Sequence, residues 1–340
     1  MSLSIELLVF MTRVLVNGTA AKEGGALTIL NSYIESKSAD SQDFFYIFSP
    51  ICPDVMPVNS KWIRFRTGGF FTLFFSLFLS GLFAVFLRCD KVVSFSNINT
   101  MLTFFYVKRV TYFHNMLILE SNSIKYRFLR FCLRFFFQYN SKFIFQSYYV
   151  KDKFSTVLGL PRFSSVCWPG IKSYKNVRQD TYEIRGGDFY SLVLPITDTS
   201  NDNKNFDYAL QLLSLDSDSK LRFSVTSSPE SGALSSCDCL SFVGSVPHDA
   251  FLDSLKRYDG VLILSKTESL CLPIFEALNQ QVPVFVLEQD YIKGLYQLFG
   301  DIKGLYVFSD FRSLIESLEQ AALDTDDYYD SRYVTSDWDF

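Results

Sequence analysis

Two glutamates, Glu268 and Glu276, flank the start of a short helix that the sequence predicts near Pro273. Proline suits the first turn of a helix, so the segment IFEALN should be helical. Glu276 then lies within about one turn of the helix N-terminus, where backbone N–H groups point outward and favour anions. These residues could hold a phosphate-bearing ligand, with a carboxylate beside it to accept hydroxyl hydrogen bonds. The same pattern would also suit an ordinary amphipathic helix with two solvated glutamates.

Short apolar runs on either side predict the strands that position this helix. Val261–Leu264 has the composition of a strand, and Val282–Val286 reads as the next one. Strands and helices alternate in this way from about Arg13 to about Ala322, without a repeat or a low-complexity tract. The chain of 340 residues is long enough for two domains. We therefore predict an α/β protein with two doubly wound Rossmann-like domains that face one cleft.

The stretch from Glu268 to Ala277, ESLCLPIFEA, resembles the nucleotide-sugar signature of family 4 of the GT-B glycosyltransferases. That signature has two glutamates separated by seven residues, as this stretch has. The resemblance implies that Glu276 holds the ribose hydroxyls of a nucleoside diphosphate sugar and that Glu268 lies near the donor sugar. It also implies that the turn formed by Cys271, Leu272 and Pro273 binds the donor. Cys271 and Gln281 stand where the family usually has glycine.

Two further segments of the second half resemble donor-binding parts of the same family. Lys204-Asn205 matches a Lys-Asn pair whose lysine contacts the donor diphosphate, while Thr197 and Asp198 stand where the family has an arginine. A lysine in a solvated loop is the alternative for Lys204. The segment around Ser245 and Val246 resembles one whose backbone lies beside the nucleotide base.

The first half carries a glycine loop and a histidine at strand ends. A strand at Arg13–Asn17 is followed by Gly18 and by the pair Gly24 and Gly25, which lets backbone N–H groups approach a phosphate or sugar. The loop does not match G-x-G-x-x-G, so no dinucleotide site is predicted. The resemblance implies that this loop faces the acceptor side of the cleft and that His114 lies by the donor phosphate and sugar. The alternatives are a plain tight turn for the glycine loop and a structural role for His114.

Two segments of the first half suggest contact with a membrane. Thr67–Leu87 contains no charged residue and could span a bilayer, but its place between two strands favours a helix partly buried against the sheet. Ile124–Phe137 interleaves phenylalanines with basic residues, which is typical of a membrane-surface helix or of a solvated helix face. The first 170 residues carry 18 Lys and Arg against 9 Asp and Glu, and the remaining 170 carry 14 against 27. A basic first half attracts phosphates of anionic lipids, whereas no nucleic-acid-binding motif accompanies the charge.

The seven cysteines are scattered without a C-x-x-C pair, which predicts reduced thiols in a cytosolic protein. Neither Cys237-Asp-Cys239 nor the two histidines have metal-ligand spacing, so no metal site and no cofactor are predicted. The first residues, MSLSIELLVFMTR, lack the features of a signal peptide. The segment Pro169-Gly170-Ile171 resembles the family's crossover between domains. We place the domains at 1–172 and 173–322, with a linker at 173–188 and an acidic tail at 323–340.

The resemblance implies a retaining, metal-independent glycosyltransferase of hexosyltransferase type. Its donor would be a UDP or GDP sugar, and its acceptor a glycan, on a polyprenyl diphosphate or another carrier, in surface polysaccharide synthesis. The enzyme would lie in the cytoplasm, bound peripherally to the inner face of the membrane. One alternative is a nucleotide-sugar epimerase of the same fold, although two histidines in all argue against it. A second is a non-catalytic relative that binds a partner or acts as a scaffold, which the departures at Thr197, Cys271 and Gln281 favour.

Overall fold

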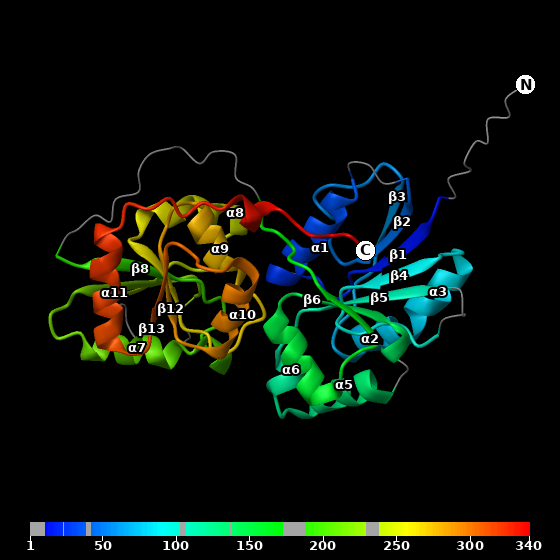
Figure 1. Ribbon diagram of the computed structural model, residues 1–340, viewed down its shortest axis with the longest axis horizontal. Helices are drawn as coiled ribbons and strands as arrows, with labels where there is room; N and C mark the ends of the chain where they lie inside the picture. Colours follow the sequence, from blue (N-terminus) through cyan, green and yellow to red (C-terminus); the bar gives the residue numbers. More distant parts are fainter. Residues whose placement is uncertain are drawn as a thin grey trace, which may run out of the picture. The chain divides into compact units, whose positions relative to one another are not determined.

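The chain forms two compact units, which Figure 1 shows in sequence colours. The computed structural model describes residues 11–22, 24–38, 42–102, 107–135, 138–172, 188–228 and 238–340. One unit comprises Met1–Gly170 with Ser336–Phe340, and the other comprises Ile171–Thr335. The N-terminal run 1–10, residues 136–137 of the predicted basic helix, most of the predicted linker (173–187) and Cys237 lie outside the described residues.

The first unit is built on a parallel sheet of seven strands in the order β3-β2-β1-β4-β5-β6-β7. The strand order reverses between β1 and β4, which is the switch point of a doubly wound sheet. Short apolar runs form these strands because both faces of a parallel sheet are covered. They are β1 (Arg13–Asn17), β2 (Phe44–Ser49), β3 (Ser60–Arg64), β4 (Lys91–Ser94), β5 (Lys108–Phe113), β6 (Lys142–Phe145) and β7 (Phe163–Val166).

The helices of the first unit connect consecutive strands, as right-handed crossovers of a parallel sheet require. Ser147 caps one of them, because its side chain accepts a hydrogen bond from the backbone of Val150. The helices are α1 (Gly24–Ser36), α2 (Phe70–Phe74), α3 (Ser80–Phe86), α4 (Leu117–Glu120), α5 (Ile124–Phe135) and α6 (Tyr148–Leu158), with a 3-10 turn at Gln138–Asn140.

The uncharged run predicted as a partly buried helix forms α2 and α3, joined by a π-helical turn at Phe75–Leu79. Its inner face combines the large side chains of Phe75 and Leu77 with small residues, and a Cβ on Gly81 would lie 2.0 Å from the carbonyl oxygen of Leu102. Its outer face leaves Phe70 66% and Phe71 70% exposed. The expectation of a helix with one buried face is confirmed. Among the helices of the described part of the chain, none is both long enough and apolar enough to cross a membrane.

The second unit contains a parallel sheet of six strands in the order β10-β9-β8-β11-β12-β13. Here the strand order reverses between β8 and β11, so this sheet has a switch point of its own. The strands are β8 (Tyr190–Leu194), β9 (Leu221–Val225), β10 (Leu240–Phe242), β11 (Gly260–Ile263), β12 (Val284–Leu287) and β13 (Leu305–Phe308).

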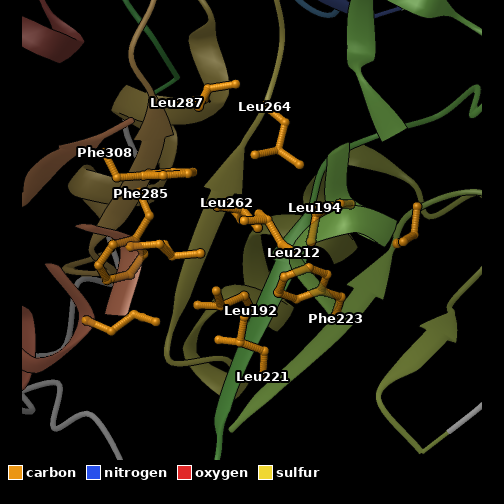
Figure 2. Close-up of a cluster of buried hydrophobic side chains, with 14 of the residues drawn as sticks. Leu192, Leu194, Leu212, Leu221, Phe223, Leu262, Leu264, Phe285, Leu287 and Phe308 are labelled. Atoms are coloured by element: carbon orange, nitrogen blue, oxygen red, sulfur yellow. The ribbon is translucent and has the colours of Figure 1, made fainter. Parts of the chain in front are cut away.

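Two helices cover one face of the second sheet and enclose a buried apolar cluster. Leu192, Leu194 and Phe223 point from the strands toward Leu212 of α7 (Figure 2), and the cluster extends to Leu314 of α11. The predicted strands at Val261–Leu264 and Val282–Val286 and the predicted helix near Pro273 agree with the structure to within two residues. The helices are α7 (Phe206–Leu215), α8 (His248–Ser254), α9 (Leu272–Asn279), α10 (Asp290–Phe299), α11 (Phe311–Leu323) and α12 (Ser331–Val334), with a 3-10 turn at Asp202–Lys204.

The last residues of the chain return to the first unit. The Trp338 ring lies 5.1 Å from that of Tyr112 and 5.5 Å from that of Tyr33, measured between centroids. Its indole Nε1 donates to Ser32 Oγ at 2.9 Å, and Lys37 Nζ donates to its carbonyl oxygen at 2.7 Å. A buried tryptophan with satisfied polar groups therefore anchors this end of the acidic tail.

One expectation about the cysteines is wrong. Five cysteines in the described part of the chain are free, and four of these are buried: Cys89, Cys132, Cys167 and Cys271. Cys239 is instead disulfide-bonded, so the prediction that every cysteine is a reduced thiol fails there. Its neighbour in the C-x-C sequence lies outside the described residues.

Candidate functional site

Lys204, Glu268 and Cys271, three of the predicted site residues, lie in loops at the switch point of the second sheet. Two loops leave the carboxyl ends of the adjacent strands β8 and β11, and open α/β sheets bind ligands at such a place. The loops are bonded to each other: Asn205 Nδ2 donates to the Leu264 carbonyl oxygen at 3.2 Å, and Asn203 Nδ2 to that of Thr267 at 2.8 Å. The backbone N–H of Lys266 donates to Asn203 in return, at 2.9 Å. The first loop is therefore held against the turn that precedes α9.

This arrangement brings Lys204 and Glu268 together. Lys204 Nζ lies 2.7 Å from Glu268 Oε1, with side chains 29% and 18% exposed. Burial alone would favour the neutral amine, but the Glu268 carboxylate raises the pKa of Lys204 above its ordinary value. The ammonium is thus a fixed positive charge at pH 7, close to the start of α9.

Helix α9 presents its N-terminus at the same corner. Pro273 lies in its first turn, as the sequence predicts, and Leu272–Asn279 are buried apart from that proline. Cys271 is the N-cap residue and adopts a left-handed backbone with φ of 53°. Glycine would adopt this conformation without strain, whereas residues with a Cβ are strained in it. The Cys271 thiol is buried, which raises its pKa well above the ordinary value and keeps it protonated.

Gln281, the second departure from the family pattern, has the same backbone property. Its φ is 63°, and α9 ends one residue before it at the C-cap Gln280. The side chain is fastened to the C-terminal segment: its Nε2 donates to Asp327 Oδ1 at 2.5 Å and its Oε1 accepts from the backbone of Tyr328 at 3.0 Å. These two bonds offset the strain that glycine would have avoided.

We expect substitution of Cys271 to reveal this strained conformation. Valine should lower the free energy of unfolding by about 2 kcal/mol, because a β-branched side chain tolerates positive φ least. Glycine should change it by less than about 1 kcal/mol, since relief of strain offsets the lost buried thiol. Urea unfolding of the two variants measures the difference. Equal stability of Cys271→Val and Cys271→Gly would argue against a left-handed residue here.

Glu276 is the second buried carboxylate, and it meets a histidine that the sequence did not single out. Its side chain is 6% exposed, and its Oε1 lies 2.9 Å from Nε2 of His248, the first residue of α8. The pKa of His248 is raised, first by this hydrogen bond and further by the charge of Glu276, against an opposing effect of burial. Ser245 and Val246, predicted to lie beside the base, are in the loop that leads from β10 into α8.

The other predicted residues belong to the first unit. Gly18 follows β1, where a Cβ would lie 2.5 Å from Leu30 Cδ2, so the Leu30 side chain of α1 would have to shift to admit a larger residue. Gly24 begins α1 with φ of 58° and has open space around it, and Gly25 is exposed. A glycine pair at the start of α1 therefore leaves backbone accessible, which is the property expected of the acceptor and phosphate loop.

His114 lies at the carboxyl end of β5, beside the switch point of the first sheet. Asn97, itself at φ of 63°, accepts from the backbone N–H groups of His114 and Asn115 at 2.7 and 2.9 Å. Burial lowers the pKa of His114 to about 4, and its Nδ1 is buried without a hydrogen-bond partner. The imidazole is therefore neutral at pH 7.

Comparison with solved structures identifies the architecture. WaaG, a glycosyltransferase of lipopolysaccharide biosynthesis, matches with a TM-score of 0.64 and 12% identity, over 92% of this chain and 90% of that one. Sucrose-phosphate synthase from Thermosynechococcus elongatus matches with a TM-score of 0.65 and 12% identity, over 93% of this chain and 90% of that one. Anabaena HepE in complex with UDP-glucose matches with a TM-score of 0.63 and 14% identity, over 93% of this chain and 91% of that one. The chain has the GT-B fold.

The predicted fold class is therefore confirmed, with one Rossmann-like sheet in each unit. No protein-family model matches this GT-B chain, and no curated protein sequence matches it. At these identities the likeness extends to the fold alone. Any activity must be argued from the residues of the site.

Proposed function

We propose that the protein is a glycosyltransferase that transfers a sugar from a nucleoside diphosphate donor, a UDP or GDP sugar, to a glycan acceptor. The observation that carries this proposal is the Lys204–Glu268 pair at the switch point, next to the start of α9. A cation and a helix N-terminus at one corner favour a diphosphate. Carboxylates at the same place, Glu268 and Glu276, suit the hydroxyl groups of a sugar and a ribose.

The chemical requirement is to stabilise negative charge on the diphosphate as it departs. We assign this to the Lys204 ammonium and to the N–H groups at the start of α9, which are held in position before the reaction begins. Glu276 binds the ribose hydroxyls, and Ser245 and Val246 lie along the base. Glu268 lies beside the donor sugar. Retention of configuration, a hexosyl donor and independence of metal ions follow the resemblance to family 4, and we assign no protein nucleophile.

A stripe of phenylalanines on α5 supports a membrane-held acceptor. Ile124, Phe128, Phe131 and Phe135 recur at spacings of four, three and four, which places them on one helix face, and they are 86%, 46%, 48% and 59% exposed. The Phe131 and Phe135 rings lie 4.6 Å apart. A stripe of this kind with basic neighbours suits the boundary between headgroups and acyl chains.

The basic residues of α5 do not share one role. Arg127 and Arg134 are exposed beside the stripe. Arg130 instead donates to the carbonyl oxygens of Ile118 and Ser121, at 2.7 and 2.8 Å, so it fastens α5 to the preceding turn. Lys125, Arg127 and Arg134 are the residues available to anionic lipids, each contributing about 1 kcal/mol near such a surface.

The exposed face of α2 and α3 extends the apolar surface. Leu73 packs against the same buried cluster as Leu129 of α5, so the two helices share a core. We propose that both dock on the inner face of the cell membrane. A polyprenyl-diphosphate-linked glycan of surface polysaccharide synthesis would be reached there.

We expect the double substitution Phe128→Ser and Phe131→Ser to weaken binding to vesicles containing anionic lipid at least tenfold. Each phenylalanine that is buried in the interface contributes about 1.5–3 kcal/mol. Cosedimentation with such vesicles, at low salt, measures the loss. Phe163→Ser is the matched control, because Phe163 on β7 is also exposed, at 53%, but is outside α5. Equal binding by the double variant and the control would contradict docking through α5.

A panel of nucleotide sugars tests the proposed activity directly. Each is incubated with the protein, with and without a membrane extract as a source of acceptor, and free nucleotide is measured. Release of UDP or GDP from one donor that depends on the acceptor supports the proposal. A non-catalytic GT-B relative, which strained Cys271 and Gln281 favour, would release none, and an epimerase would convert the donor without releasing nucleotide.

A further inference from the structure

His248 and Glu276 form a pair on neighbouring helices of the second unit. Their Nε2–Oε1 distance is 2.9 Å, and His248 is 44% exposed while Glu276 is 6% exposed. An ionised carboxylate can only accept, so the imidazole Nε2–H donates this bond. Among the contacts of the described residues, it is the hydrogen bond that fixes Glu276. One carboxylate oxygen is thereby engaged, and Oε2 remains for another donor.

Three charged groups act on this imidazole. Glu276 faces it from α9, Asp249 adjoins it on α8, and Lys172 lies on the segment before the second unit's first strand. Lys172 Nζ is 3.4 Å from Asp249 Oδ1, which partly offsets both charges. The hydrogen bond to Glu276 is the largest influence, and the pKa of His248 is raised above 6.5.

We propose that His248 is a positioning residue for Glu276, and that its protonation strengthens the binding of a nucleoside diphosphate by fixing the carboxylate that receives the ribose. This inference rests on the proposed function. His248 touches neither the donor sugar nor the bond that breaks. It holds Oε1 so that Oε2 points to the ribose hydroxyls, and the partial exposure of its ring lets the proton exchange with solvent.

The direction of the pH dependence follows from the raised pKa. Below the pKa of histidine in the unfolded chain, about 6.5, the ion pair of His248 with Glu276 contributes fully to the stability of the folded protein. This contribution is lost as pH rises through the higher pKa that His248 has in the folded protein. The neutral imidazole still donates a hydrogen bond, but a weaker one. Nucleotide affinity should therefore fall about fivefold between pH 6 and pH 9.

The pair itself can be tested without nucleotide. The chain has two histidines, His114 and His248, so their ring resonances can be followed by NMR and assigned with His248→Gln. We expect His248 to titrate above 6.5 and Glu276→Gln to move that titration down. Asp249→Asn should also lower it, because Asp249 raises the pKa of His248 without touching Glu276. A titration that is unchanged by Glu276→Gln overturns the proposal.

The link to the donor is tested by calorimetry with UDP and GDP between pH 6 and pH 9. His248→Ala should bind about tenfold more weakly than wild type at pH 6. His248→Gln should restore much of the affinity, since its amide can donate to Glu276, but without the pH dependence. At each pH, the ratio of the nucleotide affinities of wild type and His248→Gln also cancels the effect of the titration of the nucleotide's own phosphate.

The outcomes separate the two claims. Nucleotide binding with equal affinity in wild type and His248→Ala, at every pH, overturns the positioning role and leaves the proposed function intact. A confirmed pair in a protein that binds no nucleotide at any pH overturns the proposed function, and the inference with it. Loss of affinity in His248→Ala, with recovery and a flat pH profile in His248→Gln, supports both.

Discussion

Replacing Glu276 with alanine is expected to weaken UDP or GDP binding at least 100-fold and to abolish turnover. Hydrogen bonds from hydroxyls to a carboxylate are worth about 1.5–3 kcal/mol each, and a ribose can offer two. The carboxylate is buried and fixed by His248, so little reorganisation is needed when the ribose arrives. Isothermal titration calorimetry measures the affinity, and release of nucleotide measures the turnover.

Two further variants make the Glu276 result specific. Glu276→Gln keeps the shape and loses the charge, so we expect an intermediate affinity with an unchanged melting temperature. Glu316→Gln is the matched control, because Glu316 is 60% exposed on the outer face of α11 and its ion pair is with Arg312 of the same helix. Full turnover in Glu276→Ala would refute the ribose role, and equal losses in Glu316→Gln would point to a general effect on folding.

Replacing Lys204 with methionine is expected to lower kcat by about 10²–10³, the loss seen when one preorganised donor to developing negative charge is removed. The effect on KM should be smaller, because the charge of the departing diphosphate grows in the transition state. Lys204→Arg keeps the charge and should retain part of the activity. Steady-state kinetics with the donor identified by the panel measure both constants.

The partner of Lys204 must be considered in that experiment. Methionine leaves Glu268 half-buried without its cation, which would repel a diphosphate as well as destabilise the loop. The double variant Lys204→Met with Glu268→Gln removes this charge and separates repulsion from lost stabilisation. Lys293→Met is the control, because the Lys293 side chain on α10 is 77% exposed. A kcat within threefold of wild type in Lys204→Met would contradict the assigned role.

The strands could be predicted from the sequence because both sheets are parallel and buried on both faces. In the strands Lys108–Phe113 and Lys142–Phe145 every residue after the first lysine is buried. The helix after Thr67 was harder, since it contains no charge to mark a solvent face. Small residues that recur at spacings of four nevertheless lie on its inner face: Ser76, Ser80 and Ala84 are buried.

The site could be predicted only in part. The spacing of Glu268 and Glu276 lies within one helix and its preceding turn, so local sequence reveals it. The pairing of Lys204 with Glu268 spans 64 positions and depends on β8 and β11 being neighbours, which is a property of the sheet order. The pairing of His248 with Glu276 spans 28 positions and two helices. No local pattern carries that information, so His248 was missed.

The backbone angles give a physical explanation for two of the departures from the family pattern. Cys271 and Gln281 both have positive φ, the conformation for which glycine is ordinarily selected. At Gln281 two hydrogen bonds from the side chain accompany the strain. At Cys271 the side chain is buried and its thiol is close enough to Lys204 and Glu268 for their charges to affect its pKa. The sequence shows the departures, whereas only the backbone angles show their common cause.

The most direct test of the central claim is a crystal structure of the protein with UDP and another with GDP. We expect one of them to show the diphosphate within hydrogen-bonding distance of Lys204 Nζ and of the N–H groups at the start of α9. The ribose hydroxyls should lie on the Glu276 carboxylate. A nucleotide bound elsewhere, or a corner closed to it by the side chain of Cys271, would contradict the claim that this site holds a nucleotide sugar.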